Sequence, residues 1–532
     1  MISSIRLKFR SPIFLLAIAS ALIAFVVQSG ELGSADTTHR LQSTHSFWTS
    51  EPPVFPNEYP EFGVHGRDGS LQSWYGIGQS LLMLPFDIVG TYIERLPAFA
   101  NYYGTDPTVR NIFVSYNVNI LLNVLTALVC FRFLCLLGFE TRHAVAGVLA
   151  LLALTTHLHY TQNMMENNYI CLLTLAGFLY QLDWVRTGRS RSLLLGSCAL
   201  GLNLLTRLTT GLDLMAGGLF VLLTLWMEGA RGAALWARIK NYLSVAFPVY
   251  ALFGLLDRLY QYHRFGSFFN TYVSVVAGEM KARDPSLPAS YPWETPFHVG
   301  FFGALFSPQK SIFLFDPLLI LILILALVAG RRFAPAVRAY AAVSALLLLA
   351  YICFYARYTV WSGDSAWGDR YVSTAAEMAA FLAVPQLLKE RRALGRAVRV
   401  AGAALIAASA AIQAASVAFW LSLELYQMTT LGNKFVVALR FENIAAFALG
   451  KMSAWGLTNS DMMSDPWDYV HITCWNVLPF VLRRVGVAPA WVFYLTLAVW
   501  LVSLALLVWV LLRLRAVLVR SESRETSVPI PG

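Results

Sequence analysis

The sequence predicts an all-α polytopic membrane protein. Of its 532 residues, 57% are apolar and only 13% are charged, whereas about a quarter of the residues are charged in a soluble domain. The mean hydropathy is +0.58. Many apolar runs also approach the roughly 20 residues that a helix needs to cross a bilayer. These three observations exclude a chain of ordinary soluble domains.

The formal net charge of +10 has a simpler explanation than nucleic-acid binding. Membrane proteins collect Lys and Arg in their cytoplasmic loops, and that bias alone makes a chain basic. The sequence has no basic stripe with interleaved aromatic residues, so we expect no nucleic-acid partner. Of the six cysteines, only Cys474 falls in a predicted outer loop, so we expect no internal disulfide.

Twelve apolar runs are candidate spans, and the fold is expected to contain about twelve transmembrane helices. The first run resembles a signal peptide, but no A-x-A cleavage site ends it, so we expect an uncleaved helix. The runs lie near 12–28, 110–137, 143–160, 167–184, 192–207, 211–228, 241–258, 312–330, 338–355, 372–388, 399–420 and 489–513.

The run 76–92 is shorter and contains Pro85 and Asp87. If it does not span, the basic clusters of the chain, including the N-terminal one, all fall on one side of the membrane. The positive-inside rule therefore favours an interfacial helix on the outer face, with both termini cytoplasmic. We expect a multi-pass protein of a bacterial inner membrane.

This topology places four sizeable loops on the outer face, and the inner loops are short and basic. We therefore expect the chemistry on the outer face. The expected organisation is a catalytic membrane module at 1–420 with its first outer loop at 29–109, an outer loop or cap at 421–488, a last span at 489–514 and a tail at 515–532. The loop 421–488 carries Trp455, Asp461, Asp465, Trp467 and Asp468. It is expected either to shape an acceptor site or to form a structural cap.

The first outer loop carries an acid, Asp36, a few residues beyond the first span, together with Arg40 and His45. A carboxylate in partly dry protein can act as a general base. The alternative interpretation is that Asp36 only caps a short helix that begins at Thr37. The residues alone support the two interpretations equally.

The loop 357–371 contains Trp361, Trp367, Arg370 and Tyr371. A guanidinium group suits phosphate oxygens because it donates two parallel hydrogen bonds. The alternative, which the residues alone favour, is an interfacial aromatic belt with a snorkelling arginine. Lys310 stands at a helix start, where the helix dipole disfavours a cation, so it indicates either a partner anion or a snorkelling lysine.

Glu166 lies at the top of a helix, where the macrodipole favours an acid. His157 and His159 do not share a helical face, so a metal site there is not expected, although His159 with Glu166 stays open as a pair. No DxD motif or cluster of acids stands out. We therefore expect no metal cofactor, with a divalent metal as the alternative. There is also no ladder of intramembrane acids of the kind that a proton-driven pump would need.

Four stretches, in this order along residues 13–390, resemble motifs of the GT-C superfamily of integral membrane glycosyltransferases, which includes protein O-mannosyltransferases and the lipid A aminoarabinose transferase. They are a helix followed at once by SADTTHRLQST, the stretch YGIGQSLLMLPFDIVG, the stretch LFSPQKSIFLFDPLLIL, and WSGDSAWGDRY, which is similar to WxGGxxWGPRYL. In the last motif Asp364 stands for a glycine and Asp369 for a proline. Gln309 replaces a glycine in the third, and the first loop lacks an adjacent Asp-Glu pair.

The resemblance implies transfer of a sugar from a polyprenyl-phosphate donor to a lipid, glycan or protein acceptor on the outer face. It implies that Asp36 takes the proton of the acceptor hydroxyl as this attacks the anomeric carbon. Arg370, Lys310 and Arg40 would stabilise the leaving phosphate, and the lipid tail would lie in a groove between helices. The other residues expected to line the site are Glu166, His45, Trp361, Trp367 and Tyr371.

Two further functions remain as alternatives. A transporter or flippase of a lipid-linked glycan would show inverted repeats and broken midplane helices, and neither is clear in the sequence. An inactive relative that binds lipid is compatible with the motif departures. Both differ from the enzyme in one respect, because neither would consume a lipid-linked sugar.

Overall fold

Regular structure in this computed structural model is almost wholly helical. The structure describes residues 11–56, 62–102, 107–364, 366–421, 423, 424, 427, 435–449, 475–485 and 489–525. Within these ranges the strands are a two-stranded antiparallel ribbon of β1 (Val64–His65) and β2 (Leu71–Gln72). The predicted all-α class is confirmed.

The helices follow one another through short connections. The first half contains α2 (Pro12–Val27), α3 (Ala35–His45), α4 (Gly78–Glu94), η1 (Pro97–Phe99), α5 (Val109–Leu136), α6 (Thr141–Leu154), α7 (His157–Gln162), α8 (Asn167–Thr187), α9 (Ser190–Leu204), η2 (Leu208–Thr210), α10 (Gly211–Met227) and α11 (Gly232–Phe265). The second half contains α12 (Tyr272–Arg283), α13 (Phe297–Phe306), α14 (Ile312–Phe315), α15 (Leu318–Ala329), η3 (Gly330–Arg332), α16 (Pro335–Tyr355), α17 (Ser373–Ala380), α18 (Ala383–Glu390), α19 (Arg396–Ser416), α21 (Val436–Ala448), α23 (Leu478–Val485) and α24 (Ala490–Glu525).

Six helical segments among the described residues are long and apolar enough to cross a membrane. They are Val109–Leu136, Leu208–Met227, Gly232–Phe265, Pro335–Tyr355, Arg396–Ser416 and Ala490–Arg520. Several expected spans are shorter or interrupted: 312–330 is divided into α14 and α15 at Asp316 and Pro317, and 372–388 is divided into α17 and α18. Pro317 accounts for the first break, because proline supplies no backbone N–H to a continuing helix. The count of twelve spans stays a prediction.

The centre of the bundle is α8, which packs against α5 and α9, while α2 packs against α5 and α24. The core includes a group of rings from four helices that pack edge to face or tilted: Phe133, Phe178, Phe220 and Tyr340. In a bilayer, such close packing holds helices together where transfer from water contributes little.

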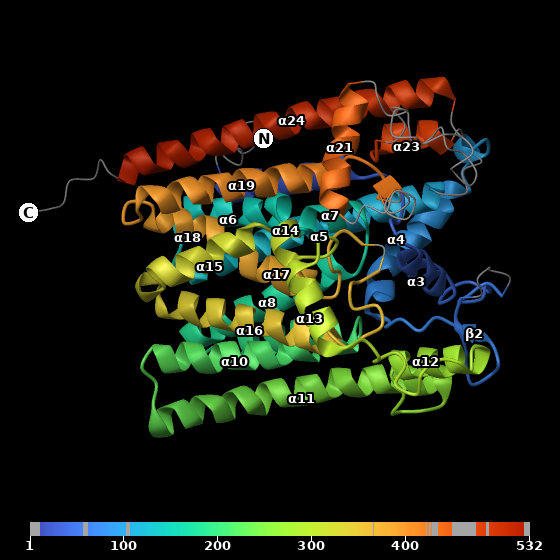
Figure 1. Cartoon of the computed structure of the whole chain (residues 1–532), viewed down its shortest axis with the longest axis horizontal. Coiled ribbons are helices and arrows are strands. Elements are labelled where there is room, and N and C mark those ends of the chain that lie inside the picture. Colours follow the sequence, from blue (N-terminus) through green and yellow to red (C-terminus); the bar gives the residue numbers. More distant parts are fainter. Residues whose placement is uncertain are drawn as a thin grey trace, which may run out of the picture.

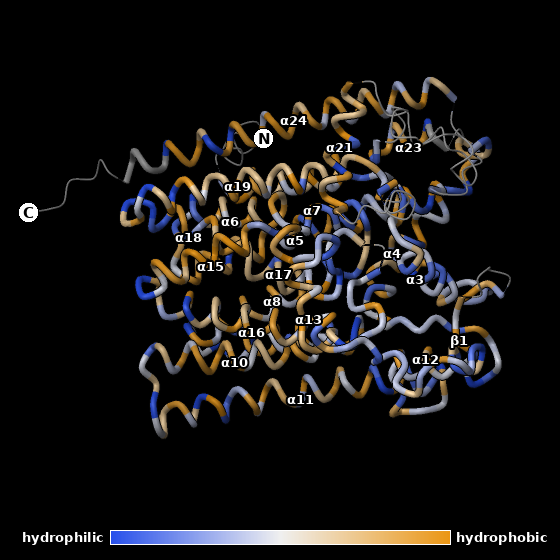
Figure 2. The backbone as a smooth tube through the Cα atoms, viewed as in Figure 1, coloured by the Kyte–Doolittle hydropathy of each residue, from blue (hydrophilic) through white to orange (hydrophobic). Residues whose placement is uncertain are grey.

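The two ends of the bundle differ in polarity. Figure 2 shows hydrophilic residues gathered at the end that carries α3 and α12, and Figure 1 shows the connections α10–α11, α15–α16 and α18–α19 at the opposite end. These connections carry basic residues, among them Arg231, Arg331 and Arg391. These three basic connections and the loop of Asp36 therefore lie at opposite ends, as the positive-inside argument requires.

The run 76–92 forms α4, which packs against α3 and α5 near the polar end (Figure 1). Its interfacial position in a membrane stays a prediction. In the expected cap 421–488, α21 packs on α19, and the buried Arg440 makes two hydrogen bonds of 2.6 and 2.8 Å to Glu424. The aromatic and acidic stretch 450–474, with Trp455, Asp461, Asp465, Trp467 and Asp468, lies outside the described residues.

Candidate functional site

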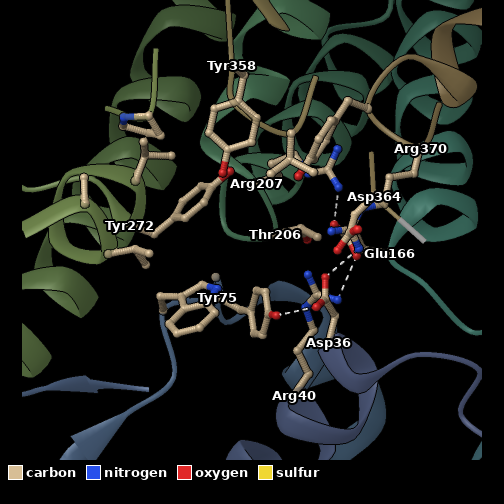
Figure 3. A pocket seen from close by; sticks show the side chains of 18 of the residues that line it. Asp36, Arg40, Tyr75, Glu166, Thr206, Arg207, Tyr272, Tyr358, Asp364 and Arg370 are labelled. Carbon is tan, nitrogen blue, oxygen red and sulfur yellow. Dashed lines mark hydrogen bonds and ion pairs between the residues drawn. The ribbon is translucent and has the colours of Figure 1, made fainter. Parts of the chain in front are cut away.

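A cavity of about 250 Å³, called here the central cavity, lies at the polar end of the bundle (Figure 3). Segments far apart in the sequence meet there: α3, the residues just before α4 and α8, α12, and the loop between α16 and α17. Its charged lining residues are Asp36, Arg40, Glu166, Arg207, Asp364 and Arg370, and its aromatic ones are Trp74, Tyr75, Tyr272, Tyr291, Tyr358 and Tyr371.

Asp36 lies in the first turn of α3 and faces the central cavity. The cap of this helix is supplied by Ser34, whose hydroxyl accepts the Thr37 N–H at 3.2 Å. The Asp36 carboxylate is therefore not needed as the cap. Its Oδ2 accepts a hydrogen bond of 2.7 Å from Arg370 Nη1, 334 residues away, and its Oδ1 accepts one of 2.6 Å from the Tyr75 hydroxyl.

Glu166 lies beside this pair and holds two more arginines. It precedes α8, is buried, and forms an ion pair of 2.7 Å with Arg40 and a further ion pair with Arg207. The Arg40 guanidinium also stacks over the Tyr75 ring at 4.0 Å. Two guanidinium groups thus share one carboxylate, so these three side chains together carry a net positive charge.

Burial and the arginines act in opposite directions on these carboxyl groups. Burial alone would raise the pKa of Asp36, but Arg370, Arg40 and the Tyr75 hydroxyl hold it below its usual value of 3.8. Burial would likewise raise the pKa of Glu166, and the guanidinium groups of Arg40 and Arg207 hold it below its usual range. Both groups are therefore carboxylates at neutral pH.

The loop that carries Arg370 is shaped by glycines. Gly363 and Gly368 both have a φ of +73°, and a Cβ on Gly363 would lie 2.7 Å from the backbone N of Arg370. Only glycine permits this close approach at such a φ without strain. Asp369, which stands where the resembling motif has proline, accepts the Tyr371 N–H at 3.0 Å and stabilises the same turn.

Lys310 is hydrogen-bonded to the backbone of this loop. Its ammonium donates hydrogen bonds of 2.6, 2.8 and 3.0 Å to the carbonyl oxygens of Asp364, Ala366 and Gly368. An ammonium group has three N–H donors, so all of them are engaged. The side chain is buried and does not line the central cavity. This placement differs from the expected role on the donor phosphate.

The structure brings together Asp36, Arg40, Glu166, Arg370 and Tyr371 around the central cavity, as the sequence led us to expect. Three other expected lining residues lie elsewhere. His45 is buried with its Nδ1 2.9 Å from the Asp87 carboxylate, Trp361 covers Gly303 on α13, and Trp367 is fully buried against Phe315. Each has a packing partner that no local sequence pattern indicates.

Several lining residues were not singled out from the sequence as members of the site. Tyr75 closes the opening loop and bonds Asp36, and Arg207 pairs with Glu166. The signal for Arg207 was its charge within an otherwise apolar run, because such residues usually face a cavity or a partner. Tyr272, Tyr291 and Tyr358 come from loops and helices without any motif.

An apolar groove of about 710 Å³ adjoins the central cavity. It runs between the start of α10, α12 and the end of α16. Both spaces are lined by Tyr272, Val273, Ala277, Tyr291, Pro292 and Tyr358. A long apolar chain in the groove would therefore place its polar end in the central cavity.

A third space, the side cavity of about 590 Å³, lies around Asp36 as well. It is lined by the chain from Glu31 to Asp36, by His39 of α3, by His159 and Asn163, and by part of the loop of Asp364. Beneath these spaces, His157, Cys171 and Glu377 place possible metal-ligand atoms within 4.8 Å of one another. His159 bonds Asn163, whereas Glu166 pairs with two arginines, so the partners of these two residues differ.

Replacing Glu166 by Ala should destabilise the fold strongly. The change leaves Arg40 and Arg207 buried without their shared carboxylate, and breaking a buried ion pair from one side costs about 3–5 kcal/mol. Thermal unfolding of the purified protein in detergent measures the loss. The matched control is Glu51→Ala, whose side chain is 46% exposed. Equal unfolding temperatures for the two variants would contradict the role of Glu166.

A scan against protein-family models found no match, and neither did a search of curated protein sequences. Among solved structures, the chain is similar to the Archaeoglobus fulgidus oligosaccharyltransferase tethered with an acceptor peptide containing the NVT sequon, at 16% identity over 89% of this chain and 64% of that chain, with a TM-score of 0.47. It is also similar to ArnT from Cupriavidus metallidurans bound to undecaprenyl phosphate, at 14% identity over 88% of this chain and 84% of that chain, with a TM-score of 0.41. The chain thus covers less than two thirds of the oligosaccharyltransferase. The residues of the central cavity, rather than these similarities, are the evidence for a function.

Proposed function

We propose that the protein is a membrane glycosyltransferase that moves a sugar from a polyprenyl-phosphate donor to an acceptor hydroxyl on the extracytoplasmic face. One observation carries the proposal. The Asp36–Arg370 pair stands in a polar cavity that is rich in arginine and adjoins an apolar groove. A lipid phosphate needs this combination of surfaces, and a transferase also needs a carboxylate beside it. The resemblance of the motifs to GT-C glycosyltransferases agrees with the proposal.

The arginines supply the site for the donor phosphate. Arg370 keeps one guanidinium N–H, at Nε, that is buried and has no hydrogen-bond partner among the described residues. Arg40 and Arg207 share a single carboxylate, so one positive charge at this end is not balanced within that trio. Guanidinium groups bind phosphate oxygens through paired hydrogen bonds, and we assign the phosphate to this face of the cavity.

The apolar groove accommodates the polyprenyl chain. Its lining is dominated by apolar and aromatic side chains from α10, α12, α16 and the connection between α12 and α13, with Trp293 and Phe354 among them. Burying isoprenoid units there keeps the lipid in the membrane while its phosphate reaches the arginines. The sugar then lies in the central cavity among Tyr75, Tyr272 and Tyr358, whose rings can stack on its apolar face.

The reaction is a displacement at the anomeric carbon. The acceptor oxygen forms the new bond to this carbon, the bond from carbon to phosphate oxygen breaks, and polyprenyl phosphate leaves with the bonding electrons. The acceptor proton passes to Asp36. In the structure Arg370 donates a hydrogen bond to that carboxylate. A donor phosphate that draws Arg370 toward itself leaves Asp36 free to act as the base, while Tyr75 keeps it oriented.

The pH dependence of transfer follows from the lowered pKa of Asp36. A base works only when it is unprotonated, and Asp36 loses its proton below its usual value of 3.8. The acid limb of kcat/KM, which reports the free enzyme, should therefore lie below about pH 4. Initial rates measured from pH 4 to pH 8 test this. A limb centred above pH 5 would contradict the assignment of Asp36 as the base.

A donor panel tests the proposed function. The purified protein in lipid nanodiscs is given several labelled polyprenyl-phosphate sugars, and nucleotide sugars serve as control donors. We expect at least one lipid donor to be consumed and none of the nucleotide sugars. Consumption of nucleotide sugars alone would contradict the proposal, because they have no chain to fill the apolar groove.

A further inference from the structure

Asp364 stands at the junction of the central cavity and the side cavity. Three residues line both spaces: Asp36, Asp364 and Arg370. The first and third are paired with each other. Figure 3 shows the Asp364 side chain among the residues that face the central cavity. Any molecule that enters the side cavity and reaches Asp36 therefore meets this carboxylate.

The backbone of Asp364 is in the left-handed region, with a φ of 57°, and it is the one non-glycine residue with a positive φ among the described residues. Glycine adopts this conformation without strain, and the resembling motif has glycine at this position. The turn itself therefore does not require an acid. Strained residues of this kind cluster at ligand-binding and catalytic sites.

The Asp364 carboxylate is available to a ligand. The residue is exposed, and its backbone carbonyl, not its side chain, receives the Lys310 ammonium. The structure gives no hydrogen bond or ion pair for its carboxylate among the residues that it describes, whereas Asp36 and Glu166 are both held by arginines. Lys310 makes its hydrogen bond to the Asp364 backbone carbonyl and interacts with the Asp364 carboxylate only through the electrostatic field.

The described lining of the side cavity carries more negative than positive charge. Of the aspartates that line it, Asp36 is paired with its one arginine, Arg370, and Asp364 is not. The two imidazoles do not offset this. Burial lowers the pKa of His39 to about 4, and His159 Nε2 lies 2.6 Å from the Asn163 amide nitrogen, which suits a neutral ring that accepts a hydrogen bond.

The side cavity is lined by other residues than the apolar groove that would hold the lipid. It shares three lining residues with the central cavity and none with the apolar groove. A donor whose tail fills the groove therefore approaches Asp36 from one side and leaves the side cavity open. An acceptor hydroxyl that enters there reaches Asp36 and the anomeric carbon together.

On the basis of the proposed function, we propose that the side cavity is the acceptor site and that Asp364 selects the acceptor by binding one of its hydroxyl or ammonium groups. The acceptor class is a neutral or aminated glycan. A phosphorylated acceptor is rejected, because its anion would face the Asp364 carboxylate while the Arg370 guanidinium is already paired with Asp36. Asp364 is a specificity-determining residue, and the base remains Asp36.

Equilibrium binding tests this without any turnover. The full-length protein in nanodiscs is titrated with three matched disaccharides that are neutral, aminated or phosphorylated, and separately with undecaprenyl phosphate. We expect the aminated probe to bind at least about tenfold more tightly than the phosphorylated one. Asp364→Asn should reduce the affinity for the aminated probe by about tenfold and leave undecaprenyl phosphate binding within about twofold.

Two further variants keep the result interpretable. Asp364→Gly removes the carboxylate while relaxing the left-handed backbone, so it should fold at least as well as the parent and lose the same selectivity. Asp284→Asn removes an exposed acid of the outer loops that lines neither cavity and should bind like the parent.

Equal affinity for the three probes, or unchanged affinities in both Asp364 variants, would overturn the inference. The proposed function fails separately, by the absence of sugar transfer from any lipid donor, because binding of the probes needs no reaction.

Discussion

Replacing Asp36 by Asn should reduce sugar transfer by about 10²–10⁴-fold, the usual contribution of a positioned general base. Asn has the size of Asp and can still accept the Tyr75 hydroxyl at its amide oxygen, so the shape of the cavity is retained. It cannot take the proton from the acceptor hydroxyl. The Arg370 guanidinium also loses its charged partner. We expect kcat to fall much more than the KM for the donor rises.

Rates of transfer from the best lipid donor of the panel measure this effect. The matched control is Asp68→Asn, because Asp68 is an exposed acid of the same outer loop that bonds Ser70 and lines none of the three spaces. The control should transfer at the parent rate. If Asp36→Asn also transfers at the parent rate, Asp36 is not the base.

Replacing Arg370 by Gln should reduce kcat by about 10²–10³-fold, the size expected when a preorganised donor to a developing negative charge is removed. The leaving phosphate gains charge as the bond to the anomeric carbon breaks, and Arg370 is placed beside Asp36 to stabilise it. Arg370→Lys should recover only part of the rate, because an ammonium group lacks the planar fork of a guanidinium.

The control for Arg370 comes from the same loop. Arg357 is exposed and outside the central cavity, so Arg357→Gln changes the net charge equally and should leave kcat unchanged. Binding of undecaprenyl phosphate to each variant supplies a second readout. Full activity of Arg370→Gln, or an equal loss in Arg357→Gln, would show that overall charge and not the guanidinium beside Asp36 is what matters.

The sequence predicts the class of fold and the end of the bundle where the site lies. Apolar runs and the loops that carry Lys and Arg can both be recognised from the order of residues along the chain. It also directs attention to Asp36 and Arg370, which belong to short patterns. It does not predict that they touch, since 334 residues separate them. It does not predict the Arg207–Glu166 pair either, because a pairing between two helices leaves no local pattern.

Local sequence patterns do not predict which neighbours a polar side chain faces. Lys310 is a cation at the outer end of a helix, and the sequence does not distinguish a lysine that faces a ligand from one that binds three carbonyl oxygens. His45 belongs to the expected loop, but Asp87 of α4 draws it away from the cavity. Asp316, between α14 and α15, likewise accepts the N–H of Thr156, 160 residues away, at 2.8 Å.

The stoichiometry of donor consumption tests the central claim most directly. The protein in nanodiscs is incubated with a labelled polyprenyl-phosphate sugar and an acceptor, and the released polyprenyl phosphate and the glycosylated acceptor are both quantified. A glycosyltransferase releases one polyprenyl phosphate for each sugar transferred, and Asp36→Asn reduces the formation of both products by the same factor. Recovery of the intact donor at the end of the incubation, with no polyprenyl phosphate released, would contradict this account and favour a protein that only binds or transports the lipid.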